Sequence, residues 1–99
     1  MKDKLISLGF KDVYQKKDFG STLPGVDYLY RQVDCRHQYI SLIHYGGEFI
    51  EGVLQEYLAV KNTRPAKPNL TAKQLDEQGY TPVRKALARF PHEVFEFFS

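Results

Sequence analysis

The chain has 99 residues, of which 42% are hydrophobic, and its 14 basic and 12 acidic side chains give a formal net charge of +2. This length predicts one domain spanning residues 1–99, and the hydrophobic share excludes a disordered chain. The nearly balanced charge indicates neither a nucleic-acid nor a membrane partner, and a single cysteine excludes an intramolecular disulfide. The first residues lack the apolar core and cleavage site of a signal peptide, so a cytoplasmic location is expected.

The N-terminal part of the chain predicts a short helix followed by strands. Lys2 to Leu8 can form the helix, which Gly9 ends in a left-handed turn so that Phe10 folds back onto it. Lys11 to Lys16 is a candidate edge strand whose lysines discourage pairing with other chains.

A small antiparallel sheet is expected in the middle of the chain. After a Gly- and Pro-containing loop, Tyr28 to Val33 and Tyr39 to Tyr45 have strand character. The second of these strands is apolar on both faces, which is typical of a central strand covered on both sides.

Two structures compete after Gly46-Gly47. A two-residue hairpin at this dipeptide would continue the sheet. Alternatively, the apolar residues between Glu48 and Lys61 recur in adjacent pairs every fourth position and fall within half of a helical circle. We favour the amphipathic helix, because a strand would place Glu and Gln side chains on both of its faces.

The C-terminal third predicts further helices. Asn62 to Pro68 is a linker, Thr71 can cap a helix that ends near Gln78, and Thr81-Pro82 is typical of a new helix start. His92 to Phe98 predicts a last helical turn or two. The fold class expected is therefore α+β: a short N-terminal helix, a small antiparallel sheet of about three strands, an amphipathic helix and a helical C-terminal segment.

Candidate chemistry is sparse. In the segment Asp34-Cys35-Arg36-His37, the cationic neighbours could lower the thiol pKa, so a Cys35-dependent enzyme is one alternative. An orienting third group is not evident. Cys35 and the histidines do not have metal-ligand spacing, so we predict no metal, no cofactor and no catalytic residues.

Nucleic-acid binding is a second alternative, carried by the basic C-terminal segment. The run from Thr81 to Leu87 resembles the start of the recognition helix in winged-helix repressors of the gluconate-operon type, although the interval from Leu75 to Val83 is shorter than their turn. The resemblance implies that Thr81 and Arg84 contact DNA, assisted by Lys85. The full candidate set for nucleic acid is Lys61, Arg64, Lys67, Thr81, Arg84 and Lys85.

The leading hypothesis is a non-enzymatic binding protein that acts through a protein partner. Aromatic side chains at an exposed patch are typical interface anchors, and the candidates are Phe95, Phe97, Phe98, Tyr28 and Tyr30. A small chain of this kind would also suit an accessory or inhibitor protein encoded by a mobile element. A homo-oligomer is a further option, through a sheet edge or the Phe-rich C-terminus.

Overall fold

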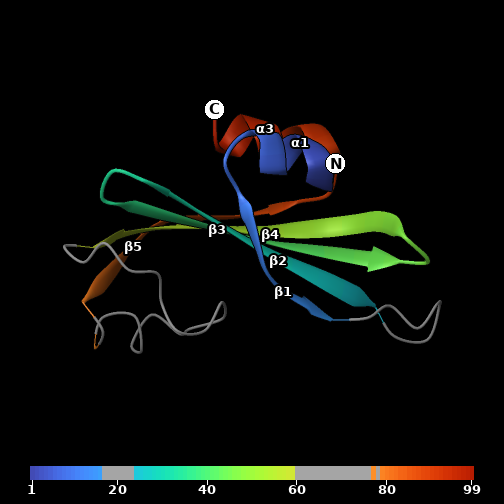
Figure 1. Cartoon of the computed structure of the whole chain (residues 1–99), viewed down its shortest axis with the longest axis horizontal. Helices are drawn as coiled ribbons and strands as arrows, with labels where there is room; N and C mark the ends of the chain where they lie inside the picture. The colour runs from blue at the N-terminus through green and yellow to red at the C-terminus, as the bar shows by residue number, and fades with distance from the viewer. Residues whose placement is uncertain (17–23, 60–76, 78) are drawn as a thin grey trace.

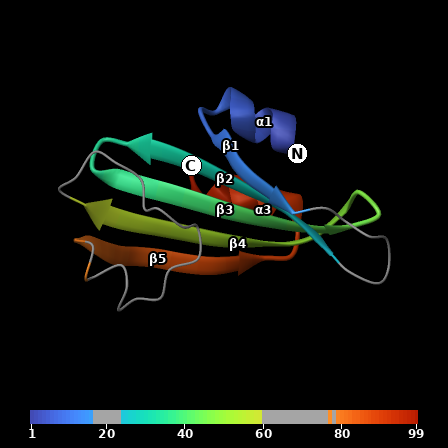
Figure 2. The ribbon, with the colours of Figure 1, turned by 60° about the horizontal axis from the view of Figure 1, so that its bottom comes forward.

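The protein, seen in a computed structural model that describes residues 1–16, 24–59, 77 and 79–99, is built on one five-stranded antiparallel sheet in the order β1-β2-β3-β4-β5. The elements in chain order are α1 (Lys2–Ser7), β1 (Lys11–Lys16), β2 (Gly25–Val33), β3 (Arg36–Tyr45), β4 (Glu48–Ala59), β5 (Tyr80–Ala88) and α3 (Pro91–Phe97). Both helices lie on one face of the sheet (Figure 1), and the strands follow one another across it in sequence order (Figure 2). The expected α+β class with about three strands is wrong, because the described residues form a mainly β fold with five strands and two short helices, α1 and α3.

The amphipathic helix predicted from Glu48 to Lys61 is not formed, and the segment is instead strand β4. Gly46 and Gly47 have φ angles of 55° and 82°, which suit a two-residue turn of type I′, and Tyr45 pairs directly with Glu48 across it. The hairpin alternative is therefore confirmed. Because β4 lies inside the sheet and its middle part is covered on both faces, with Leu54 and Glu56 buried on one face and Tyr57 on the other, it lacks the simple alternation of polar and apolar residues.

Alanine substitutions at Gly47 in the turn and at Gly52 in strand β4 provide a matched test of this hairpin. Replacing Gly47 with alanine is expected to lower the free energy of unfolding by about 1 to 2 kcal/mol, because its φ of 82° strains any residue with a Cβ. At Gly52 a Cβ would lie at ordinary contact distance, 3.5 Å from Val94 and 3.7 Å from Leu42. Gly52→Ala is therefore expected to stay within about 1 kcal/mol of the wild type in urea unfolding. Equal losses in the two variants would contradict this turn geometry.

The helix predicted to begin at Thr81 is also wrong, since this segment is strand β5, paired with β4 along its length. Pro82 is accommodated because β5 is an edge strand and the register shifts next to the Tyr57–Pro82 pair. The predicted linker from Asn62 to Pro68, and every residue except Glu77 of the helix predicted from Thr71 to Gln78, lie outside the described residues.

The two short terminal helices form where the sequence predicts them. Gly9 has a φ of 100° after α1, and the backbone N–H of Phe10 donates to the carbonyl of Leu5 at 3.1 Å, which turns Phe10 back into the core. At α3, Pro91 occupies the first turn, and Glu93 Oε1 accepts from the backbone N–H of Phe90 at 2.9 Å.

The sheet separates two buried clusters. Under the helices, the sheet contributes the aliphatic residues, and the helical segments add Leu5, Phe10 and Val94. This cluster is made up of Leu5, Phe10, Leu29, Ile40, Leu42, Leu54, Ala88 and Val94. A second cluster of four tyrosines, Tyr30, Tyr39, Tyr57 and Tyr80, lies on the opposite face.

Candidate binding surface

A row of polar side chains crosses four strands on the helix-covered face of the sheet. The register pairs Arg31 of β2 with Gln38 of β3, Gln38 with Glu56 of β4, and Glu56 with Arg84 of β5. Directly paired residues point to the same face, and this row lies next to the pairs that join Leu29, Ile40 and Leu54. We call Arg31, Gln38, Glu56 and Arg84 the polar ladder.

Each pair in the polar ladder is joined by hydrogen bonds with a fixed direction. Arg31 donates to Gln38 Oε1 from Nε at 2.9 Å and from Nη2 at 2.6 Å. Gln38 Nε2 donates to Glu56 Oε2 at 2.6 Å, and Arg84 Nε donates to Glu56 Oε1 at 3.0 Å. Both oxygens of Glu56 are therefore used as acceptors, which requires the ionised carboxylate.

Glu56 carries its charge in a fully buried side chain, with 0% of its surface exposed. Burial by itself raises the pKa of Glu56, but the hydrogen bonds from Arg84 and Gln38 and the charges of Arg84 and Arg36 outweigh it, so the pKa lies below its usual value. Glu56 is therefore the anion that fixes the surrounding arginines.

The arginines at the two ends of the polar ladder are also held by the helical segments. The Arg31 guanidinium carbon lies 4.5 Å from the Phe10 ring centre, and Arg31 Nη1 donates to the carbonyl of Leu8 at 2.9 Å. The Arg84 guanidinium carbon lies 4.2 Å from the Phe97 ring centre. These cation–π contacts restrict both side chains. Burial lowers the pKa of Arg31, and the charge of Glu56 opposes this effect.

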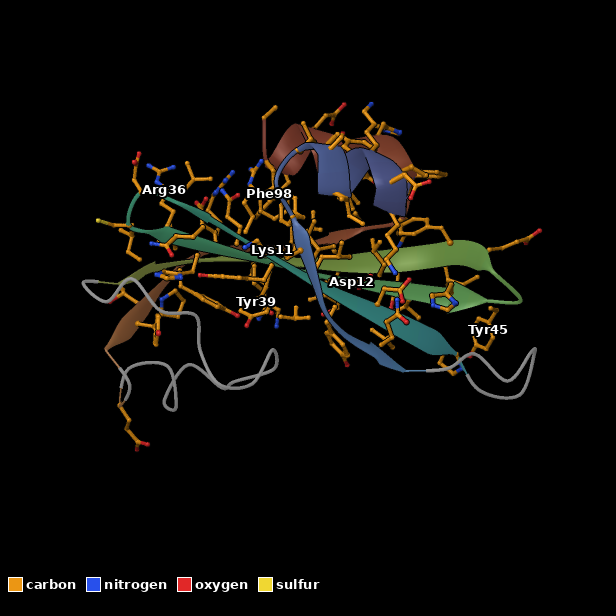
Figure 3. The ribbon with its side chains drawn as sticks, viewed as in Figure 1. Lys11, Asp12, Arg36, Tyr39, Tyr45 and Phe98 are labelled. Atoms are coloured by element: carbon orange, nitrogen blue, oxygen red, sulfur yellow. The ribbon has the colours of Figure 1, made fainter. Side chains whose placement is uncertain are left out.

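A second row runs beside the polar ladder and is exposed on all four strands. The register pairs Val33 with Arg36, Arg36 with Leu58, and Leu58 with Thr81. Val33 and Leu58 are 41% and 42% exposed, and the Arg36 side chain is 58% exposed. Figure 3 shows Arg36 on the helix side of the sheet but beyond the helices, with Tyr39 on the opposite side. We call Val33, Arg36, Leu58 and Thr81 the outer row.

The polar ladder and the outer row meet at one carboxylate oxygen. Arg84 Nε lies 3.0 Å and Arg36 Nη1 lies 3.9 Å from Glu56 Oε1, so both guanidinium groups converge on the same atom. Within the described part of the chain, the Arg36 side chain makes no hydrogen bond and the Arg84 side chain makes one, through Nε alone. Their remaining N–H groups are available to an external carboxylate or phosphate.

The tyrosine cluster on the opposite face contains a second buried polar group. Tyr30 Oη and His37 Nδ1 share a hydrogen bond of 2.5 Å, and His37 lies edge-on to Tyr80 with ring centres 5.4 Å apart. Tyr57 is 2% exposed, and among the described residues its hydroxyl finds no hydrogen-bond partner. Burial raises the pKa of Tyr57, with a smaller contribution from Tyr39.

Replacing two of these tyrosines by phenylalanine is expected to have opposite effects. Tyr57→Phe removes an unpaired buried hydroxyl and should leave the free energy of unfolding unchanged or raise it by about 1 kcal/mol. Tyr30→Phe leaves His37 without its Tyr30 hydrogen bond and should lower the free energy of unfolding by about 1 to 2 kcal/mol. Denaturant unfolding of both variants tests this, and a loss for Tyr57→Phe as large as that for Tyr30→Phe would contradict the assignment.

A cavity of about 280 Å³ lies at the other end of the sheet, near the hairpin between β3 and β4. Its lining includes Lys2, Asp27, His44 and Phe49, and His44 Nε2 lies 3.7 Å from Asp27 Oδ2. Among the residues that the structure describes, no group of three or more His, Cys, Asp or Glu side chains could hold a metal ion.

Cys35 and His37, which are two positions apart in the sequence, lie in different surroundings. Cys35 is an exposed free cysteine in the turn between β2 and β3. His37 is fully buried in the tyrosine cluster. The pair therefore does not share a solvent-accessible cleft, and the Cys35 enzyme stays an untested prediction.

The residues predicted for a protein partner lie against the body of the molecule. Phe95, Phe97 and Phe98 are partly buried against the cluster under the helices, where Phe98 meets Phe10 with ring centres 5.3 Å apart. Tyr28 is half-buried, and Tyr30 is buried in the tyrosine cluster.

The predicted nucleic-acid residues divide into three groups. Lys61, Arg64 and Lys67 lie outside the described residues. Thr81 and Arg84 pair with Leu58 and Glu56 on the helix-covered face, whereas Lys85 pairs with Gln55 on the tyrosine face. Arg84 and Lys85 are exposed but point to opposite faces of the strand, so they do not form one surface.

The sequence alone does not identify Val33, Gln38, Glu56 or Leu58 as members of a site, although it indicates Arg36 as a cationic neighbour of Cys35. The signal that could have located them is the strand register, since these residues are far apart in the chain and meet only through it.

No helix in the described part of the chain has the length and apolar character needed to cross a membrane.

The sequence matches no known protein-family model, and comparison with curated proteins and with solved structures also finds no match.

Proposed function

We propose that this protein is a non-enzymatic binding module that recognises another protein through the outer row and the adjoining end of the polar ladder. The observation that carries the proposal is the exposure of two aliphatic side chains, Val33 and Leu58, on either side of an exposed arginine. Apolar contact area with an arginine at its centre is typical of protein interfaces.

The rigidity of this surface supports the proposal. Its four members lie on four neighbouring strands, and the polar ladder beside it is hydrogen-bonded from end to end. A surface that is already ordered loses little conformational entropy when it binds, which favours affinity.

A photo-crosslinking experiment tests the surface directly. A benzophenone amino acid is placed at Leu58, and the matched control carries it at Leu87, which is 59% exposed and lies on the tyrosine face. Both proteins are irradiated in lysate of the source cells, crosslinked proteins are identified, and each is purified and tested for direct binding. We expect one protein to crosslink from position 58 alone and to bind the purified wild type. Crosslinks of equal strength from position 87, or none from position 58, would contradict the proposal.

A further inference from the structure

The arginines around Glu56 carry more positive charge than its carboxylate neutralises. Arg31, Arg36 and Arg84 surround this one anionic group. Arg31 donates its side-chain hydrogen bonds to neutral acceptors, the Gln38 side chain and the Leu8 carbonyl. These three arginines and Glu56 together therefore keep a net positive charge after these contacts are made.

The excess charge is directed outward at Arg36 and Arg84. Glu56 contacts both guanidinium groups through the same oxygen, Oε1, and both side chains are substantially exposed, at 58% and 43%. The aromatic ring of Phe97 restricts Arg84 from one side. Because both guanidinium groups approach the same oxygen, they lie close enough together for a single external carboxylate to accept hydrogen bonds from both arginines.

Apolar neighbours accompany these donors. Val33 and Leu58 flank Arg36 on the adjacent strands of the sheet. Four strands span about 14 Å across the sheet, which is the length of about four to five residues of an extended chain. A ligand with an acidic side chain between aliphatic or aromatic side chains would therefore match both the charge and the spacing of the outer row.

These features favour an acidic protein segment over a nucleic acid. Nucleic-acid surfaces combine a track of cations with free aromatic faces for base stacking. Here Phe97 lies against the Arg84 guanidinium and Phe10 is buried beneath that of Arg31, while the exposed Lys85 is on the opposite face. The outer row offers aliphatic rather than aromatic contacts.

We infer that the partner presents a short segment in which an Asp or Glu side chain, flanked by apolar residues, is held by Arg36 and Arg84 above the buried Glu56. This inference rests on the proposed function and specifies the chemistry of its ligand. In the complex, the external carboxylate shares the two guanidinium groups with Glu56 and its apolar neighbours cover Val33 and Leu58.

Selection from a phage library of random linear peptides tests the inference with a defined probe. Wild type and the variants Arg36→Ala, Leu58→Asp and Lys85→Glu are immobilised, after circular dichroism and denaturant unfolding have confirmed that each is folded. Peptides enriched on the wild type are synthesised, and their affinities are measured for all four proteins. A second peptide set carries Asn or Gln in place of each acid, and mixed-sequence duplex and single-stranded DNA are measured in parallel.

We expect enriched peptides that contain an acid beside apolar residues and that lose about tenfold or more in affinity on Arg36→Ala or on neutralising the acid. Leu58→Asp should abolish their binding, whereas Lys85→Glu should change it by no more than about twofold. Peptides that depend on Leu58 but not on Arg36 would overturn the inference and leave the proposed function standing. Peptides insensitive to both substitutions, or DNA binding that depends on Arg36, would overturn the proposed function as well.

Discussion

Replacing Phe10 with alanine is expected to lower the free energy of unfolding by about 4 kcal/mol, a larger loss than at any exposed position of the chain. Phe10 is 1% exposed and packs edge-on against Phe98. Its ring also lies under the guanidinium of Arg31, so the substitution removes core volume and one support of the polar ladder together.

Phe90 offers a matched control for this prediction. It is 61% exposed and lies outside the cluster under the helices, so Phe90→Ala should change the free energy of unfolding by no more than about 0.5 kcal/mol. Denaturant unfolding of the two variants provides the comparison. If Phe10→Ala and Phe90→Ala lost similar unfolding free energy, or if Phe10→Ala lost less than about 1 kcal/mol, the terminal segments would not pack on the sheet as described.

The second large effect is expected at Glu56. Glu56→Gln should lower the free energy of unfolding at neutral pH by about 2 to 3 kcal/mol, because the new amide must direct its N–H₂ group at a donor of either Gln38 or Arg84. Glu48 lies at the exposed start of the same strand, and Glu48→Gln should have an effect of no more than about 0.5 kcal/mol.

The pH dependence of the difference in unfolding free energy between wild type and Glu56→Gln shows whether the Glu56 carboxylate is ionised in the folded protein. The pKa of Glu56 is lowered in the folded state, so its contribution to stability is present above the unfolded pKa and is lost as the pH falls through the folded pKa. The gap between wild type and Glu56→Gln should therefore be constant near neutral pH and shrink below about pH 4.3. Unfolding curves at a series of pH values test this, and a gap that widened toward acid would mean that Glu56 is protonated in the fold.

The sequence predicts the ends of the chain better than its centre, for local reasons. Gly9 and Pro91 act within one turn of backbone, so their effects are visible in a few residues. The prediction for β4 is wrong because Glu56 stands on a buried face, where a strand pattern requires an apolar residue. The Thr81-Pro82 pair is equally compatible with a helix start and with an irregular edge strand.

The polar ladder could not be located without an exact register. A two-residue turn at Gly46–Gly47 continued without irregularity would place Gln38 opposite Gln55. The register shift between Ile43 and His44 moves Gln38 opposite Glu56 instead. The hydrogen-bonded row thus depends on an irregularity that no local sequence pattern indicates, and the pairing of β4 with β5 contains a second register shift directly beside the Glu56–Arg84 pair.

A charge-exchange binding measurement tests the acidic-segment account most directly. It uses one selected peptide and its counterpart with Lys in place of the acid, each titrated into wild type, Arg36→Glu and Lys85→Glu by calorimetry. We predict that wild type prefers the acidic peptide, that Arg36→Glu prefers the basic one, and that Lys85→Glu keeps the wild-type preference. An unchanged preference for the acidic peptide in Arg36→Glu would contradict recognition of an acidic partner at this end of the sheet.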